Sequence, residues 1–553
     1  MNRIHELFSW QQQESLLFTR LDFWLFFLAV MAVFVLIHKR YLLRSIFLTG
    51  VSLFFYFKTS GNFVLLLGFM LLFNYLIGRG VGWLDRPKWN KGFLIAGLIV
   101  NLAGLFYFKY AYFFTDAFNA QFGTDYNVVN QFAVIGNEWF GKGSFVDKIL
   151  VPMGVSFFTF HNISYLVDIS RKEIPAAKNF FDYAFYVTYF PHLIAGPIVR
   201  ARDFIPQIHQ PYQLSKYEFS WALWMIGKGL LKKLVFADYI AVHFIDKVLD
   251  APGSYPGFVG LIAMFAYSLQ IYADFSGYTD MAIGVSKLMG FDLLENFKSP
   301  YKAISVADFW RRWHKSLGSW LRDYLYIPLG GNQKGSWGTA IMTAVILGFL
   351  YFITGWVELW YTYGILLLIY LVLWQFWKAF RTFAVRDLNL LITMIVGGLW
   401  HGASQNFVIW GAMNGAALVI YNYWKRISPY EHATNWPVRA WRIFLTLTFI
   451  TFTRIWFRLP EADQPLKFLT IVTEQFDWTD QTWWIVWNTY QGIFYLIILG
   501  FLTHWLPQKW KDQTVLFFSK WPMPVQALTF AVAVFVMYQA VSDTFKAFVY
   551  FQF

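Results

Sequence analysis

Residues 21–40, LDFWLFFLAVMAVFVLIHKR, carry the stretch that decides the fold. Its apolar part is long enough to cross the hydrocarbon core of a bilayer as a helix. It ends directly at the basic triplet His38-Lys39-Arg40, and basic residues collect in the cytoplasmic loops of membrane proteins. The stretch therefore indicates a membrane-spanning helix followed by a cytoplasmic loop.

The same pattern of an apolar run and a short polar connection recurs along the chain. Further runs of spanning length lie at 41–57, 61–78, 92–113, 150–168, 219–245, 257–275, 337–356, 358–377, 405–423, 441–457, 486–505 and 526–546. Several contain polar residues, and irregular backbone at membrane depth is tolerated where protein surrounds it. We expect an all-α polytopic membrane protein with about 11–13 spans, some of them tilted or re-entrant.

The composition excludes a soluble single domain. Of the 553 residues, 58% are hydrophobic, 22% aromatic and only 14% charged, whereas about a quarter of the residues in ordinary globular proteins are charged. The same composition excludes a disordered chain, a coiled coil and a collagen-like fibre. The absence of cysteine excludes disulfides, thiolate metal sites and an acyl-cysteine intermediate.

The formal charge of +13 collects between the apolar runs, which argues against a nucleic-acid binder. Basic loops at 38–44, 79–91, 171–178, 298–334 and 425–442 are predicted to be cytoplasmic. The acidic segment 115–147 is then expected on the opposite side. The first twenty residues lack the basic region and cleavage site of a removable signal peptide.

Polar residues inside apolar runs are costly, so they are the first candidates for function. In 151–168, Ser156, Thr159 and Asn162 either bond neighbouring backbone in a bent helix or line a cavity. In 189–203, two prolines flank a glycine, which predicts a broken or re-entrant element.

Two carboxylates, Asp274 and Asp280, lie at the end of another apolar run. Residues six apart lie on different faces of a helix, which argues against a paired acid and base. We expect structural pairing of these carboxylates with arginine or backbone donors.

The segment 308–317 is dense in tryptophan and cationic residues, and helical spacing would place Trp310 and His314 on one face. A helix anchored at the membrane interface by tryptophan and arginine explains most of this composition. It does not explain His314.

A second histidine, His401, lies between Trp400 and Gly402 in the sequence GGLWHGAS at 397–404. We expect the small neighbours to leave room for a substrate beside the imidazole, whose unperturbed pKa suits proton abstraction near neutral pH. The alternative is a packed core histidine. Two histidines without a carboxylate at ligand spacing fall short of a three-ligand zinc site, so we expect no metal.

The chain resembles the membrane-bound O-acyltransferase (MBOAT) family, in its bacterial polysaccharide branch, and most closely the alginate O-acetylation proteins. The resemblance covers roughly residues 20–460. The motifs that carry it are PHLIAGP at 191–197, DFSGYTD at 274–280, FWRRWH at 309–314, YIPLGG at 326–331 and GLWHG at 398–402. It implies a ring of helices around a membrane funnel, with a core at 1–460, additional C-terminal helices at 461–553 and no separate soluble domain.

The resemblance also implies roles for residues at the matching positions. His401 is expected as the general base and His314 as the second catalytic position. We expect the substrate-binding residues to be Trp310, Trp313, Trp400 and Arg311. The implied donor is a cytoplasmic thioester such as acetyl-CoA, with no bound cofactor. The implied partner is an extracytoplasmic SGNH-type acetyltransferase or a polysaccharide-export complex, at the bacterial inner membrane.

Three other functions remain open at this point. D-alanyl transfer and lipid O-acylation belong to the same superfamily and differ in donor or acceptor. A transporter that passes acyl groups or lipid-linked sugars without covalent chemistry would use a similar aromatic cavity, although the chain shows no duplicated halves.

Overall fold

The computed structural model describes residues 16–83, 87–143, 146–333, 336–354 and 378–540, with isolated residues between 361 and 376. Within these ranges every regular element is a helix, which confirms the all-α prediction. Several sequence predictions fall outside the described residues. These are the first fifteen residues, Arg86, Lys334, most of the predicted span 358–377 and the end of the span 526–546.

The N-terminal helices follow the apolar runs closely. They are α2 (Leu21–Ile37), α3 (Tyr41–Ser60), α4 (Phe63–Trp83), α5 (Pro87–Phe122) and α6 (Gln131–Phe140). Helix α2 has the predicted bounds, and α5 extends well beyond the predicted run at both ends. A network of amides inside this group links α4 and α5, because Asn101 donates to the Oδ1 of Asn74 over 2.6 Å.

Five described helices are long and apolar enough to cross a membrane, by length and composition. They are α3, α4, α5, α13 (Gly257–Leu288) and α22 (Asp480–Trp505). Shorter apolar helices include α2 and α24 (Met523–Tyr538). The chain is thus a multi-pass membrane protein.

The predicted break in 189–203 is confirmed. The helices of this region are α7 (Val155–Ser170), α8 (Phe180–Thr188), α9 (Phe190–Leu193) and α10 (Ala201–Ile208). Helix α9 begins at Phe190 with Pro191 in its first turn, and it lasts only four residues because Gly196-Pro197 follows it. A close approach fixes the start of α7, where Gly154 has φ of 74° and a side chain there would overlap the carbonyl oxygen of Leu193.

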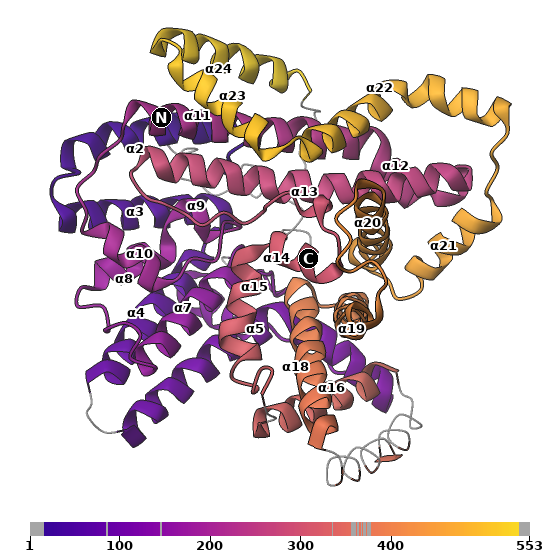
Figure 1. Cartoon of the computed structure of the whole chain (residues 1–553). Helices are drawn as coiled ribbons and strands as arrows, with labels where there is room; N and C mark the ends of the chain where they lie inside the picture. Colours follow the sequence, from indigo (N-terminus) through magenta and orange to yellow (C-terminus); the bar gives the residue numbers. More distant parts are fainter. Residues whose placement is uncertain are drawn as a thin grey trace.

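The central part of the chain forms one nearly continuous helical hairpin. It consists of α11 (Lys216–Leu231), the π-helical turns η2 (Lys232–Tyr239) and η3 (Ala241–Ile245), α12 (Asp246–Asp250), η4 (Pro252–Ser254) and α13. Figure 1 shows α13 crossing the middle of the molecule beside α11.

The carboxylates of α13 have structural partners, as predicted, but the partners are lysines rather than arginines. Asp274 pairs with Lys233 at 2.6 Å. Asp280 pairs with Lys232 at 2.7 Å and with Lys228 at 3.2 Å. These ion pairs join α13 to α11 and η2.

The remaining helices surround this hairpin. The next elements along the chain are short: η5 (Pro300–Lys302), α14 (Val306–Arg312), α15 (Lys315–Leu321) and η6 (Arg322–Tyr326). Three longer helices follow them: α16 (Trp337–Thr354), α18 (Lys378–His401) and α19 (Gln405–Ile427). The last are α20 (Trp436–Arg458), α21 (Gln464–Glu474), α22, α23 (Gln508–Lys520) and α24. In Figure 1, α14 and α15 lie between the N-terminal helices and the group α18–α20, while α23 and α24 lie along α11.

Candidate active site

His401 is the last residue of α18, and its side chain is only 4% exposed. Two side chains of α5 bind the end of this helix. The ammonium of Lys109 donates to the carbonyl oxygens of Trp400 at 2.6 Å and of His401 at 3.0 Å, and the hydroxyl of Tyr110 donates to that of Leu399 at 2.6 Å. A cation at a helix C-terminus satisfies carbonyls that have no partner within the helix. The position of His401 is thus fixed from α5.

The glycines beside His401 serve helix packing. A side chain on Gly398 would overlap the carbonyl oxygen of Phe407, and one on Gly402 would overlap the Phe407 ring. The prediction that the small neighbours leave room for a substrate was therefore wrong at Gly398 and Gly402, because α19 occupies that space, although Gly397 lines a cavity together with His401. The absence of side chains allows α18 and α19 to pack closely as a hairpin with His401 at its tip.

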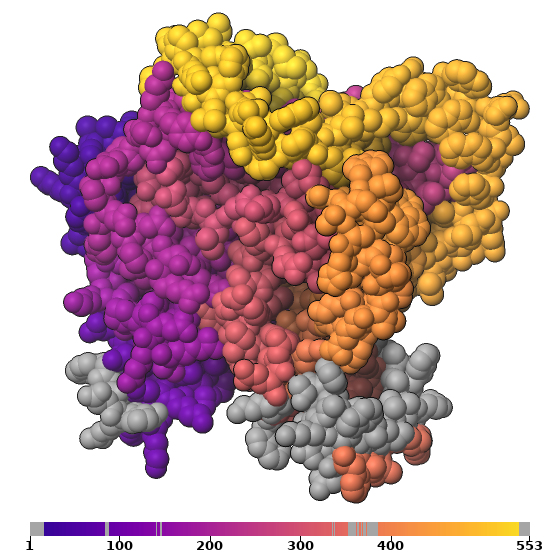
Figure 2. Space-filling model, in the orientation of Figure 1, coloured from indigo at the N-terminus to yellow at the C-terminus, as the bar shows by residue number. Residues whose placement is uncertain are grey.

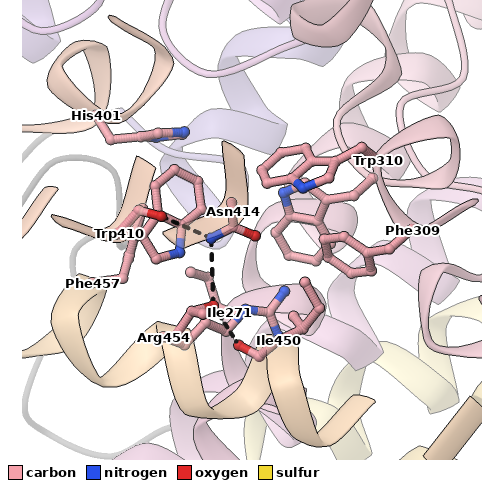
Figure 3. A pocket seen from close by; sticks show the side chains of 11 residues that line it. Ile271, Phe309, Trp310, His401, Trp410, Asn414, Ile450, Arg454 and Phe457 are labelled. Atoms are coloured by element: carbon pink, nitrogen blue, oxygen red, sulfur yellow. Dashed lines mark hydrogen bonds between the residues drawn. The ribbon is translucent and has the colours of Figure 1, made fainter. Parts of the chain in front are cut away.

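Aromatic rings surround the imidazole of His401. Ring centroids lie 4.9 Å away for Trp400, 5.2 Å for Trp410 and 5.1 Å for Phe457. Figure 3 shows His401 above a small cleft lined also by Trp310 and Asn414. These rings shield the imidazole from water. Such shielding favours transfer between two bound substrates over hydrolysis of one of them.

A large basic chamber lies next to His401 and has a volume of about 800 Å³. It is lined by residues of α14, α15, η6, α18 and α19, and in Figure 2 the surface recedes between the residues of α15 and the orange residues of α19. The cationic side chains that line the chamber are Arg311, Lys315, Arg322, Arg386 and Lys425. Such a chamber attracts an anionic ligand.

A smaller cavity of about 70 Å³ lies on another side of His401. Its walls come from α5, the segment 151–157 and Ile194, and include Lys109, Ser156 and Trp400. Of the residues described, His401 is the one shared by this cavity, the basic chamber and the cleft of Figure 3. Ser156 thus lines a cavity, which is one of the two alternatives predicted for the segment 151–168.

His314 lies near this site but not on the same helix as Trp310. Helix α14 ends at Arg312, and His314 adopts a left-handed conformation with φ of 43°. The predicted helical alignment of Trp310 and His314 was therefore wrong. Asn296 stabilises this conformation through the two residues that follow His314. The backbone carbonyl of Asn296 accepts a hydrogen bond from the backbone amide of Lys315, and its Oδ1 accepts one from the backbone amide of Ser316. A non-glycine residue in this region is strained, and such strain is concentrated at functional sites.

The imidazole of His314 is 1% exposed and packs between aromatic rings. Its centroid lies 4.6 Å from Phe275 and 6.0 Å from Trp400. Trp400 therefore lies between the two histidines, in contact with each.

The structure brings the other predicted site residues to the same region, in different settings. Trp310 borders both the cleft and the basic chamber. Trp313 is buried beneath the guanidinium of Arg454, which lies 4.5 Å from its ring centroid. Arg311 has a 72% exposed side chain at the chamber wall.

Sequence reasoning missed Lys109 as a member of the site. The signal was present, since Lys109 is a cation inside the apolar run 92–113, where a charge is costly and marks function. It also missed Asn414 and Arg454, which line the cleft of Figure 3. In the part of the chain that the structure describes, no group of three or more histidine, cysteine or acidic side chains could hold a metal ion.

A multi-pass helical membrane protein with a buried histidine between cavities is the class that this architecture defines. Residues 155–352 match the model of the membrane-bound O-acyltransferase family. The chain is 37% identical over 402 residues to the probable alginate O-acetylase AlgI of Pseudomonas putida, covering 72% of this chain and 68% of that protein. The chain belongs to the membrane-bound O-acyltransferase family and is an acyltransferase.

Relatives with other names are also similar. The chain is 31% identical to the peptidoglycan O-acetyltransferase of Helicobacter pylori, over 78% of this chain and 74% of that protein. It is 24% identical to the teichoic acid D-alanyltransferase of Bacillus subtilis, over 54% of this chain and 65% of that protein. Each of the three names combines acetyl or D-alanyl transfer with a polymer: alginate, peptidoglycan or teichoic acid.

Proposed function

We propose that this protein transfers an acetyl group from a cytoplasmic thioester toward an exported polysaccharide, with His401 as the general base. The observation that carries the proposal is that His401 lines both the basic chamber and the smaller cavity. A donor in one and an acceptor in the other would meet at the imidazole.

The reaction follows from this position. His401 takes the proton of an acceptor hydroxyl as its oxygen attacks the thioester carbonyl. The carbon–sulfur bond then breaks, and the thiolate leaves with the proton that His401 returns. An acyl-cysteine intermediate is excluded, because the chain has no cysteine. His314, across Trp400, orients the donor or acceptor or stabilises developing charge.

The basic chamber is the proposed donor site, and acetyl-CoA fits its charge because coenzyme A carries phosphates. Four of its five cations come from two loops that are predicted to be cytoplasmic, 298–334 and 425–442, and the fifth, Arg386, belongs to α18. The loops are neighbours: the guanidinium of Arg442 donates to the carbonyl oxygen of Ile304 at 3.2 Å. This arrangement supports a cytoplasmic donor entry. The smaller cavity is the proposed acceptor side, because its lining segment 151–157 follows the acidic segment 115–147 closely in the sequence.

The relatives support acetyl transfer to a polysaccharide over the alternatives. Identity is higher to proteins named O-acetylases and O-acetyltransferases than to the D-alanyltransferase. We propose the bacterial inner membrane as the location and an extracytoplasmic SGNH-type acetyltransferase or export complex as the partner. We also propose that residues 1–460 form the catalytic core and 461–553 additional helices, since the residues of the site all precede 460.

The test compares His401→Ala and His401→Gln with the native protein, at equal protein level, for acetylation of the exported polymer. Both variants should lose acetylation by at least about a hundredfold, the lower end of the range for a general base. Unchanged acetylation would overturn the proposed role of His401. Consumption of acetyl-CoA by the purified protein with an acceptor hydroxyl separates an enzyme from a transporter, which would leave the thioester intact.

A further inference from the structure

A second large cavity lies away from the active site and has a volume of about 570 Å³. Its walls come from α11, η2, α13, the segment 293–299, α22 and α23. None of its lining residues borders the three cavities around His401. We call it the lysine chamber.

Four lysines line this chamber: Lys228, Lys232, Lys298 and Lys511. Asp280 lies between Lys228 and Lys232 and neutralises part of their charge. Of the other lining carboxylates, Glu295 pairs with Lys315 at 3.3 Å, whereas Asp512 accepts from the neutral amide of Gln508 at 2.8 Å. The four lysines still outnumber the three lining carboxylates.

Lys511 lies near several other cations, with Asp280 as the opposing charge. Burial lowers the pKa of Lys511 to about 8, and the charges of Lys302, Lys232 and Lys228 act in the same direction. An anion placed among these ammonium groups would relieve their mutual repulsion.

The walls include buried polar groups that lack a hydrogen-bond partner among the described residues. The side-chain amide nitrogen of Asn296 is an example, although its Oδ1 accepts from Ser316. The hydroxyl of Thr279 is another. Buried donors without a partner are destabilising, so a ligand that accepts hydrogen bonds would be stabilising here. Phosphate oxygens are such acceptors.

Helix α23, which contributes Lys511, has the composition of a helix that lies at a membrane interface. Its apolar side chains Trp510 and Phe517 are 59% and 61% exposed, and its lysines include the exposed Lys509 and Lys520. An amphipathic helix with this pattern lies along the boundary between headgroups and acyl chains. Figure 1 shows α23 lying along the outside of the helical assembly, where lipid could contact it.

The end of α22, just before α23, is bound to the basic loop before α14. The ammonium of Lys302 donates to the carbonyl oxygen of Leu506 at 2.7 Å, and the indole of Trp505 donates to the carbonyl oxygen of Tyr301 at 3.1 Å. Because α23 has the composition of an interfacial helix, we expect the chamber that it lines to lie at headgroup depth. Apolar residues such as Trp221 and Leu231 also line the chamber, and Leu231 is 39% exposed.

We propose that the lysine chamber binds the phosphate headgroup of an anionic phospholipid, with the acyl chains lying along α11 and α23. The lysines and the amide of Asn296 contact the phosphate oxygens. The site is independent of acetyl transfer, so its test does not depend on the proposed function.

The experiment uses the full chain purified in detergent and measures lipid retained by the protein in native mass spectrometry, after incubation with phosphatidylglycerol or phosphatidylcholine. The test variant is Lys298→Met with Lys511→Met, which leaves the Asp280 ion pairs intact. The matched control is Lys509→Met with Lys520→Met, which removes two exposed lysines of α23 that do not line the chamber. Gel filtration verifies that each variant is folded.

Native protein should retain phosphatidylglycerol in preference to phosphatidylcholine. The test variant should lose roughly 30-fold in phosphatidylglycerol affinity, about fivefold for each lysine at a membrane surface, and the control should lose much less. Equal losses in the two variants would overturn the proposal. The single variant Lys298→Glu, at an exposed position, keeps the test decisive if Lys511→Met fails to fold. Thermal stabilisation by inorganic phosphate but not by phosphatidylglycerol vesicles would overturn the lipid assignment.

Discussion

The ammonium nitrogen of Lys109 lies 3.0 Å from the backbone carbonyl oxygen of His401, so a lysine in the middle of α5 holds the end of α18. The same nitrogen binds the carbonyl oxygen of Trp400. A positive charge at a helix C-terminus is favourable, and more so when it is removed from water. Lys109 therefore positions the imidazole through the backbone, and it also lines the smaller cavity.

Replacing Lys109 with methionine should lower kcat for acetyl transfer by roughly ten- to a hundredfold, because two charge-assisted hydrogen bonds of about 1.5–3 kcal/mol each are lost. KM for acetyl-CoA should change little, since Lys109 is absent from the basic chamber. Steady-state kinetics of purified protein measure both. Lys148→Met, at an exposed position beyond α6, is the control and should behave as native protein. A rise in KM with unchanged kcat would contradict a positioning role.

His314 provides a second prediction, from its left-handed backbone conformation. Asparagine tolerates this conformation better than alanine does. His314→Asn should therefore keep the thermal stability of the native protein more closely than His314→Ala. Both variants should lose acetyl transfer if the imidazole acts in the reaction. Retention of activity in His314→Asn would show that hydrogen bonding from an amide is enough at this position.

Much of the fold could be predicted from the sequence, because apolar length and basic loops are local properties. The bounds of α2 and the break at Pro191 to Pro197 followed directly from side-chain chemistry. The predicted run 219–245 agrees with the extent of α11, η2 and η3. The π-helical turns within it could not be predicted in this way, since η2 and η3 contact α13 from a distant part of the sequence.

The candidate site was predictable in part. Motif resemblance selected His401 and His314, and the structure places both beside Trp400. Their catalytic roles remain predictions. The lysine that fixes α18 is 292 residues away in sequence, and a contact at that separation has no local sequence pattern. The glycines at 398 and 402 were misinterpreted for the same reason, because Phe407 and the close packing of α19 were not visible in the sequence.

The packing of the α18–α19 hairpin predicts a sharp difference between two glycines. Gly398→Ala should destabilise the protein by about 1–3 kcal/mol or more, the usual cost of overpacking, because the new methyl group meets the backbone of Phe407. Gly348→Ala in α16 is the matched control, since nothing lies within 4 Å of the added carbon. That change should be neutral or stabilising by up to about 1 kcal/mol. Thermal unfolding in detergent checks both, and equal stability of the two variants would contradict close packing at the tip.

The basic chamber predicts how the donor is recognised. Arg311 and Lys425 are exposed at its wall and contact no part of the His401 cleft. Their charges should contribute mainly to binding, with up to about 1 kcal/mol from each exposed cation. Arg311→Met with Lys425→Met should therefore raise KM for acetyl-CoA by roughly 10- to 30-fold, with kcat nearly unchanged. The dependence of KM on salt should also weaken, because exposed charges are screened.

Lys216→Met removes a cation outside the chamber and should leave KM as it was. If donor binding were independent of charge, the salt dependence would be the same in all three proteins, and the phosphates of coenzyme A would have to bind elsewhere.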